Sequence, residues 1–306
     1  MRILLFGANG QVGHELRRSL ARQGEIVATT RSGRLEDGSA CEIADFDAPE
    51  ALPALVERIA PSLVVNAAAY TAVDKAESDR DAAFRANAEA PSRIAEACAR
   101  RGIPLVHYST DYVFDGTGTR PYREDDPTAP LGVYGESKLA GEQGIRASGA
   151  SHMILRTAWV YAPHGKNFLR TMLRLGAERD TLGVVADQIG TPTSAGLIAD
   201  VTAEVTARLL SQTGTPSGTW HLTASDETSW HGFAEAIFAG AVVRGLLPRA
   251  PQVNAIATAD YPTPARRPAY SRLDTSRLQV DFGVELPDWR EVCDLVLDGI
   301  ARSSTP

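Results

Sequence analysis

The 306-residue sequence has few cysteines and lacks the spacings of several common catalytic and metal sites. Its three cysteines, Cys41, Cys98 and Cys293, are odd in number and far apart, which disfavours a disulfide framework and favours free thiols in a reducing compartment. The sequence has no CxxC pair, no HExxH spacing and no GxSxG elbow. These absences argue against a structural zinc site, a zinc protease and a serine hydrolase, and no metal site is expected.

Long apolar runs are also missing. No run is as long as a membrane span, and the N-terminal apolar stretch reaches Gly7 too soon for the core of a signal peptide, so the expected location is the cytoplasm. A net charge of −7 disfavours a large nucleic-acid surface. With 43% hydrophobic and 23% charged residues, the chain has the composition of a folded globular protein of one large or two modest domains.

Short apolar segments alternate with helical patterns along the first half of the chain. Strands are expected at residues 3–6, 26–29, 41–44, 63–66, 103–107 and 154–155, and helices over 79–101, 134–147 and 167–178. Strands that are apolar throughout and alternate with helices predict an α/β fold with a Rossmann-type doubly wound parallel sheet. In such a sheet, ligands bind just outside the carboxyl ends of the strands, and functional residues are expected there.

Three glycines, Gly7, Gly10 and Gly13, follow the first expected strand and open the first helix. Glycine at such a turn lets the backbone approach a pyrophosphate, which the free amides and the dipole of the helix bind. The spacing is GxxGxxG, not the GxGxxG of many dehydrogenases, and a turn that merely uses glycine is the alternative. The position of this glycine turn inside an N-terminal βαβ unit favours a dinucleotide-binding site over the alternative.

The end of the second expected strand bears on the choice of dinucleotide. It carries Thr30 and Arg31 and no carboxylate that would bind the ribose diol of NADH. An arginine and hydroxyl groups can instead hold the 2′-phosphate of NADPH. NADPH is therefore the expected cofactor, with NADH as the second choice and an exposed arginine without a ligand as the alternative.

Tyr134 and Lys138 form a YxxxK pair, which places both side chains on one face of the expected helix. An ammonium group beside a phenol is expected to lower the phenol pKa, so that Tyr134 can protonate a carbonyl oxygen as hydride reaches the carbon. Thr110, just past the fifth expected strand, can hydrogen-bond the same oxygen. Each feature alone is common in ordinary helices and turns, and their combination with the glycine turn predicts a reductase.

Glycine and proline become frequent beyond about residue 185, which predicts a smaller, loop-rich second part of the chain. We expect residues 1–157 to form mainly an NADP-binding Rossmann domain, to which the chain returns at about 180–215. Residues 158–306 are expected to form mainly a smaller α/β substrate-binding domain.

With these motifs the sequence resembles the extended short-chain dehydrogenase/reductase family, and within it the dTDP-4-dehydrorhamnose reductase family. The matching segments are ILLFGANGQVG (3–13), VVNAAAYTAVDKAE (64–77), HYSTDYVFDG (107–116), YGESKLAGE (134–142), RTAWVY (156–161), NFLRTMLRL (167–175), DQIGTPT (187–193) and YPTPARRPAYSRLDT (261–275). They extend over most of the chain.

The resemblance implies roles for particular residues. Cofactor contacts would come from Gly10, Gln11 and Val12 at the pyrophosphate, Asp45 and Phe46 at the adenine, Ala69, Tyr70 and Thr71 along the cleft, and Tyr108 beside the cofactor. Tyr134 would be the proton donor with Lys138 as its partner, and both would also contact the cofactor, Lys138 at the nicotinamide ribose. Thr110, Asp111 and Trp159 would touch the sugar. Arg267 and Arg272 are candidates for the nucleotide diphosphate, which needs a cation, and an exposed structural role is their alternative.

One family feature is not fully matched. Some relatives hold a magnesium ion at a dimer contact through acidic residues. Glu15 is present here, but Gly196 stands where a glutamate is expected. The resemblance therefore leaves a homodimer open and gives no ground for metal dependence.

The implied reaction is reduction of the C4 ketone of dTDP-4-dehydro-L-rhamnose by NADPH to dTDP-L-rhamnose, the last step of dTDP-rhamnose biosynthesis for cell-surface polysaccharide. The expected partner is a small dTDP-sugar, with no nucleic acid and no membrane. Two alternatives are a nucleotide-sugar epimerase or dehydratase of the same superfamily, which returns the hydride to its substrate, and a non-catalytic regulatory subunit built like a reductase.

Overall fold

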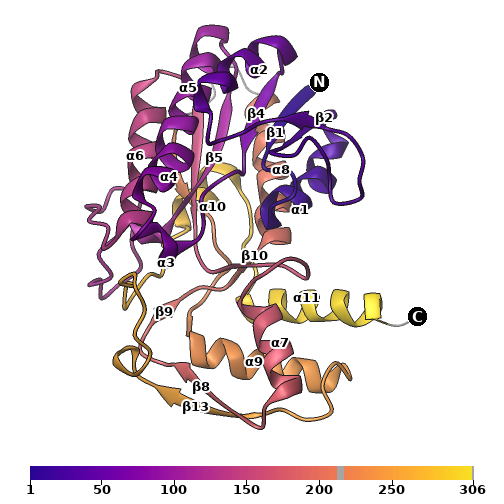
Figure 1. The fold of residues 1–306 in the computed structure, drawn as a ribbon, viewed down its shortest axis with the longest axis vertical. Coiled ribbons are helices and arrows are strands. Elements are labelled where there is room, and N and C mark those ends of the chain that lie inside the picture. The colour runs from indigo at the N-terminus through magenta and orange to yellow at the C-terminus, as the bar shows by residue number, and fades with distance from the viewer. Residues whose placement is uncertain (212–216, 305–306) are drawn as a thin grey trace.

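The computed structural model describes residues 1–211 and 217–304, and a seven-stranded parallel sheet runs through its upper part (Figure 1). The strand order is β11-β6-β5-β4-β1-β2-β3. The strands are β1 (Arg2–Phe6), β2 (Glu25–Thr30), β3 (Glu42–Ile43), β4 (Leu63–Asn66), β5 (Leu105–Thr110), β6 (His152–Thr157) and β11 (Gly218–His221). The chain leaves β1 to one side for β2 and β3 and to the other for β4, β5 and β6, so the expected doubly wound Rossmann-type fold is confirmed.

Helices cover both faces of this sheet because its strands are apolar on both sides. Ile3 and Leu5 of β1 pack towards one face, against α1 (Gln11–Ser19), α8 (Ala195–Ser211) and α10 (Ser276–Phe282). Leu4 and Phe6 pack towards the other, against α2 (Leu52–Ile59) and α5 (Ala90–Arg101), beside α6 (Val133–Ala147). Figure 1 shows these two helical layers on either side of the strands. Burial on both sides is the expected property of a parallel sheet.

Two elements differ from their expected form. The helix expected over residues 79–101 consists of α4 (Arg80–Phe84), a π-helical turn (Arg85–Glu89) and α5. Pro91 in the first turn of α5 has no N–H to continue an α-helical ladder, and the π turn accommodates this. The expectation that the fifth strand ends at residue 107 is wrong: β5 continues to Thr110, because β6 pairs with it throughout.

The second half of the chain has a hydrophobic core of its own, in the lower part of Figure 1. It is built from α7 (Phe168–Glu178), α9 (Trp230–Val243), α11 (Trp289–Ser304) and the parallel pair β8 (Thr181–Val185) and β13 (Gln252–Ile256). Short pairs join β7 (Val160–Tyr161) to β10 (Thr193–Ser194) and β9 (Ile189–Gly190) to β12 (Thr228–Ser229). The chain beyond residue 185 holds more helix than its glycine and proline content suggested: α9 and α11 belong to this second core, and α8 packs on the sheet. None of the helices in the described ranges has both the length and the apolar character needed to cross a membrane.

A buried ion pair fixes α6 to the sheet. The carboxylate of Glu142 in α6 accepts two hydrogen bonds from Arg156 of β6, at 2.8 and 2.7 Å, and a third from Arg146 at 2.8 Å. Glu142 and Arg156 are almost inaccessible to solvent. Burial alone would raise the pKa of Glu142, but the hydrogen bonds and charge of Arg156, with a hydrogen bond from Ser109 and the charge of Arg146, together lower the pKa, so the pair is ionised.

Substituting Glu142→Ala is expected to lower the free energy of unfolding by about 3–5 kcal/mol, because it leaves the Arg156 guanidinium buried without a carboxylate partner. Urea denaturation measures this loss. The matched control is Glu42→Ala, which removes an exposed partner of Arg58 and is expected to cost about 1 kcal/mol or less. Equal losses from both variants would contradict the importance given to the buried pair.

Candidate active site

The glycine turn after β1 is packed closely against the neighbouring strand. Gly7 has a φ of +80°, and a Cβ atom there would lie 2.6 Å from the backbone nitrogen of Ala68, which follows β4. A Cβ atom on Gly13 would overlap the carbonyl oxygen of Gly7. Both positions therefore require glycine, and the first turn of α1 is held where the strand order reverses. This is the place at which a Rossmann-type sheet binds a dinucleotide.

An open pocket joins this turn to the end of β2. Gly7, Gly10, Thr30 and Arg31, all expected at the cofactor, line it together with Asn9 and Ser32. The glycine backbone on one side of this pocket fits a pyrophosphate. The cation and the two hydroxyl residues on the other side fit a 2′-phosphate. One expectation needs correction: carboxylates do lie near the end of β2, since Asp45 and Asp47 each lie 3.5 Å from the Arg31 guanidinium. These two carboxylates come from the segment after β3. The sequence of β2 alone therefore does not show that they lie near Arg31.

The remaining cofactor candidates are spread along the same edge and in the core. Gln11 and Val12 are half-buried in the first turn of α1, and Ala69 and Thr71 are exposed after β4. Between these two, Tyr70 is half-buried, and its hydroxyl donates to Asp79 at 3.2 Å.

Two candidates are core residues. The Phe46 ring is buried, with its centroid 5.8 Å from that of Phe6. The Tyr108 side chain lies under α8, where its hydroxyl and that of Thr202 are 2.8 Å apart. The two aromatic side chains are thus committed to packing, and alternation along β5 explains why Tyr108 faces away from His107.

The YxxxK pair lies at the start of α6, against the end of β5. Lys138 is buried, and its ammonium nitrogen donates to the carbonyl oxygen of Tyr108 at 2.6 Å. It also lies 3.3 Å from Nε2 of His107, whose Nδ1 lies 3.1 Å from the amide nitrogen of Asn66 at the end of β4. Burial lowers the pKa of Lys138 to about 8, and burial likewise lowers the pKa of His107 well below its usual value. Strand β5, supported by Asn66 of β4, therefore holds the buried amine of α6.

The phenol of Tyr134 lies beside Thr110, one helical turn before Lys138. Burial raises the pKa of Tyr134 to about 12, a hydrogen bond with Thr110 lowers it in part, and the charge of Asp111 raises it. The expectation that Lys138 lowers this pKa is therefore not met in the structure, because the amine is directed to the Tyr108 carbonyl of β5. A phenol with this pKa is fully protonated at neutral pH, which is the form that a proton donor requires.

Thr110 and Asp111 form a buried polar pair next to this phenol. The Thr110 hydroxyl donates to Oδ1 of Asp111 at 2.9 Å and accepts from the backbone N–H of Tyr112 at 3.1 Å. Oδ2 of Asp111 is buried without a hydrogen bond of standard geometry, and burial raises the pKa of Asp111 to about 6. Tyr134, Thr110 and Asp111 are thus together, and a buried acceptor there is available for a hydroxyl group.

A small pocket opens on the other side of Tyr134. Tyr112, Tyr134 and Arg266 are among its lining residues, together with Ala265 and Pro268 from the same segment as Arg266. In the part of the chain that the structure describes, no carboxylate lies within ion-pair distance of Arg266. Arg266 is an exposed cation at this pocket that the sequence analysis did not single out.

The two arginines expected at the nucleotide are already paired. Arg267 donates to both carboxylate oxygens of Asp74, at 3.0 and 2.8 Å, and to Thr263. Arg272 donates to Glu227 at 3.1 Å. Both arginines are held by carboxylates, but neither is exposed as the alternative for them had it, and their neighbour Arg266 in the ARRP segment presents an unpaired guanidinium.

Trp159 follows β6 and belongs to an aromatic stack in the second half of the chain. Its ring lies 3.6 Å from that of Trp230, nearly parallel, and its backbone φ of +46° is rare for a residue with a side chain. A Cβ atom on Gly190 would lie 2.6 Å from the Trp159 ring, so only glycine leaves room for the indole at this point. A rigid, half-buried indole is suited to pack on a sugar, although no described contact joins it to Tyr134.

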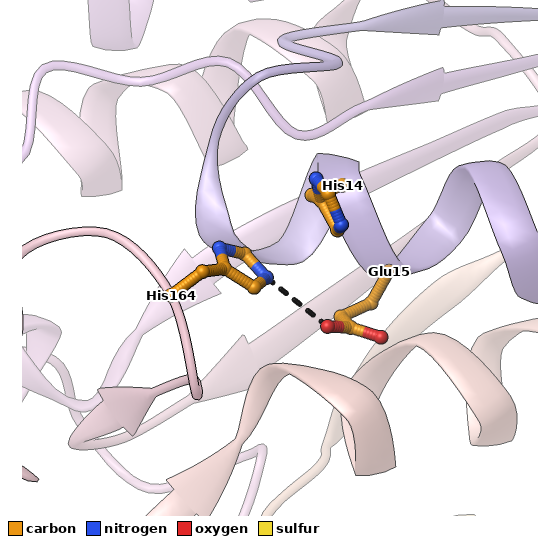
Figure 2. A group of neighbouring side chains, drawn as sticks. All are labelled: His14, Glu15 and His164. Carbon is orange, nitrogen blue, oxygen red and sulfur yellow. Dashed lines mark hydrogen bonds and ion pairs between the residues drawn. The ribbon is translucent and has the colours of Figure 1, made fainter. Parts of the chain in front are cut away.

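The acidic magnesium site of some relatives does not fit these residues. Gly196 lies at the start of α8 without a carboxylate, and Oε1 of Glu15 lies 3.1 Å from Nε2 of His164. Within residues 1–211 and 217–304, His14, Glu15 and His164 form the one group of three or more His, Cys, Asp and Glu side chains close enough to hold an ion (Figure 2). Since 149 residues separate Glu15 from His164, no local spacing could have revealed this group.

Comparison with known proteins identifies the family of this chain. Residues 1–302 match the family model described as the RmlD substrate binding domain. The dTDP-4-dehydrorhamnose reductase of Burkholderia thailandensis is 50% identical over 95% of this chain and 96% of its own length.

Two solved structures have the same fold over nearly the whole chain. That of a dTDP-4-dehydrorhamnose reductase from Clostridium acetobutylicum has a TM-score of 0.87 and 36% identity, covering 98% of this chain and 99% of its own. That of the Bacillus anthracis enzyme, in complex with NADP, also has a TM-score of 0.87, with 32% identity and coverage of 97% and 99%. The chain therefore belongs to the dTDP-4-dehydrorhamnose reductase family.

Proposed function

We propose that this protein reduces the C4 ketone of dTDP-4-dehydro-L-rhamnose with NADPH, giving dTDP-L-rhamnose in the last step of dTDP-rhamnose biosynthesis. The observation that carries the proposal is a protonated phenol, Tyr134, in contact with Thr110 at the carboxyl edge of the sheet, with a buried amine one helical turn away. The glycine turn and the Arg31 pocket on the same edge fit the NADPH that would supply the hydride when bound.

In this reaction the protein's own groups handle the proton. Tyr134 gives its proton to the C4 oxygen as charge develops there, and Thr110 orients that oxygen by hydrogen bonding. The hydrogen bond with Thr110 stabilises the phenolate that remains, and we propose that the Lys138 ammonium, one helical turn away, adds to this once it turns from the Tyr108 carbonyl. Oδ2 of Asp111 is buried without a hydrogen bond of standard geometry, beside Ser271, and is suited to bind a sugar hydroxyl.

The nucleotide end of the substrate needs a cation. Arg266 is our preferred candidate, because Arg267 and Arg272 are held by Asp74 and Glu227. Trp159 is the proposed apolar platform for the sugar. The buried thiols of Cys98 and Cys293 are free, which supports a reducing compartment and hence the cytoplasm. A homodimer remains a prediction.

Replacing Tyr134 by phenylalanine is expected to lower kcat by about 100-fold or more, because general acid catalysis contributes that much, and to leave the affinity for NADPH unchanged. The assay follows loss of NADPH absorbance with the purified dTDP-keto-sugar and identifies the product sugar. A reductase consumes NADPH stoichiometrically, whereas an epimerase would return the hydride and show no net loss. Turnover by the variant near the wild-type rate would remove Tyr134 from the mechanism.

The Arg31→Ala variant is expected to bind NADPH about tenfold more weakly, since it loses the cation and leaves Asp45 and Asp47 beside the 2′-phosphate. NADH binding should change little. Fluorescence titration of both cofactors measures the two dissociation constants, with Arg58→Ala as a control for loss of an exposed arginine elsewhere. Equal weakening of both cofactors would refute the assignment of Arg31.

His107 is expected to act as a positioning residue for Lys138. His107→Leu should lower kcat by about tenfold, because the buried amine loses a hydrogen-bond partner, and should shift the alkaline limb of the pH–rate profile below its expected position near pH 8. Lys138 is charged below that pH and neutral above it. His107→Gln, which keeps an acceptor, should restore most of the rate. An unchanged limb in His107→Leu would show that His107 only fills space.

A further inference from the structure

A group of metal-ligating side chains lies outside the proposed active site. His14 and Glu15 are neighbours in α1, and His164 lies in the segment between β7 and α7 (Figure 2). One ligand atom from each residue lies within 4.8 Å of the other two. In Figure 2 the His164 ring points its Nε2 at Glu15, while His14 projects from the helix beside it. We propose that these three side chains bind one divalent transition-metal ion of the zinc class within a single chain.

The donor set decides which ions fit. Two imidazoles and one carboxylate form a set that zinc, cobalt(II) and nickel(II) favour, and it leaves a fourth position for water. Magnesium prefers an octahedral shell of oxygen atoms, and Glu15 is the one residue of these three that offers oxygen ligands. The chemistry therefore separates this site from an acidic magnesium site between two chains.

The side chains have the freedom to close on an ion. In a tetrahedral zinc site with bonds of about 2.0–2.1 Å, ligand atoms lie about 3.3 Å apart, and the Glu15–His164 pair at 3.1 Å is already there. The His14 side chain is 39% exposed, so a rotation about its side-chain bonds can bring it in and leaves a path for the ion from solvent.

The surrounding charges fit such a site. Oε2 of Glu36 lies 3.4 Å from Nδ1 of His14, where it can orient the ring and leave Nε2 as the ligand atom. Among the described residues, Arg18 is the one Lys or Arg that pairs with Glu15, at 3.6 Å from Oε2, and it competes with a bound metal. Arg18 also pairs with Asp200 of α8 at 3.3 Å, so it keeps a partner when Glu15 binds the ion.

The site's position suggests what the ion would do. His164 belongs to the segment that leads into α7, and Asn167 of that segment donates to Gln11 at 2.8 Å, next to the glycine turn. An ion at His14, Glu15 and His164 would join the first helix of the sheet to the second half of the chain a few residues from the proposed pyrophosphate site. The expected role is to stabilise the arrangement of the two halves and not to take part in catalysis.

The test uses the full chain without a polyhistidine tag. Titration calorimetry with Zn²⁺ and the visible absorption of bound Co²⁺ should show one ion per chain, and a hundredfold excess of Zn²⁺ over its Kd should raise Tm by about 5 °C. His164→Ala, His14→Gln and Glu15→Gln should each weaken Zn²⁺ binding at least tenfold, while circular dichroism shows that each variant still folds. His231→Ala is the matched control, because His231 pairs with Glu235 at 3.3 Å without a third ligand, and it should bind Zn²⁺ as the wild type does.

Several results would overturn the proposal: cluster variants that bind Zn²⁺ as tightly as the wild type, an equal rise in Tm with Mg²⁺, or binding that appears only when sedimentation shows a dimer. None of these measurements requires turnover. Failure of the metal site would therefore leave the proposed reductase activity standing, and failure of the reductase assay would leave the metal site standing.

Discussion

The hydrogen bond from Lys138 to the carbonyl oxygen of Tyr108 sets the geometry of the whole candidate site. It ties α6 to the last residues of β5, two residues before Thr110. Since Tyr134 precedes Lys138 by one helical turn, fixing the amine on Tyr108 also fixes the phenol near Thr110. Helix geometry sets the spacing between Tyr134 and Lys138. The length of β5 sets the position of Thr110 relative to both side chains.

The same stripe of α6 carries a third anchor. Glu142 lies one turn beyond Lys138 and binds Arg156 of β6, the strand next to β5. Tyr134, Lys138 and Glu142 thus meet the sheet in succession, as a phenol, a cation and an anion. A buried amine is costly to keep charged, and the negative charge of Glu142 raises the Lys138 pKa against the effect of burial. The ion pair that stabilises the fold therefore also supports the charge that the proposed chemistry needs.

The sequence predicts those features that depend on local periodicity. Apolar segments separated by helical patterns are sufficient to predict the parallel sheet, and the glycine turn and YxxxK pair are short motifs. The prediction fails where contacts between residues distant in the sequence determine the structure. β5 extends over the polar residues Ser109 and Thr110 because β6 supplies partners for them. Asp45 reaches Arg31 from a different strand end, and Tyr108 is drawn under α8, a helix nearly 90 residues away in the sequence.

Besides the apolar packing of α8 and α10 on the sheet, polar contacts between residues far apart in sequence link the two halves of the chain. Asp74 and Arg267 join α3 (Val73–Ala76) to the segment that contributes Arg266 to the Tyr134 pocket. Gln11 and Asn167, with Glu15 and His164, join α1 to the segment before α7. One link thus lies on the substrate side and the other on the cofactor side of the same edge. Because hydrogen bonds and ion pairs are directional, links at both ends restrict how the halves can rotate against each other, which a continuous apolar interface would do less strictly.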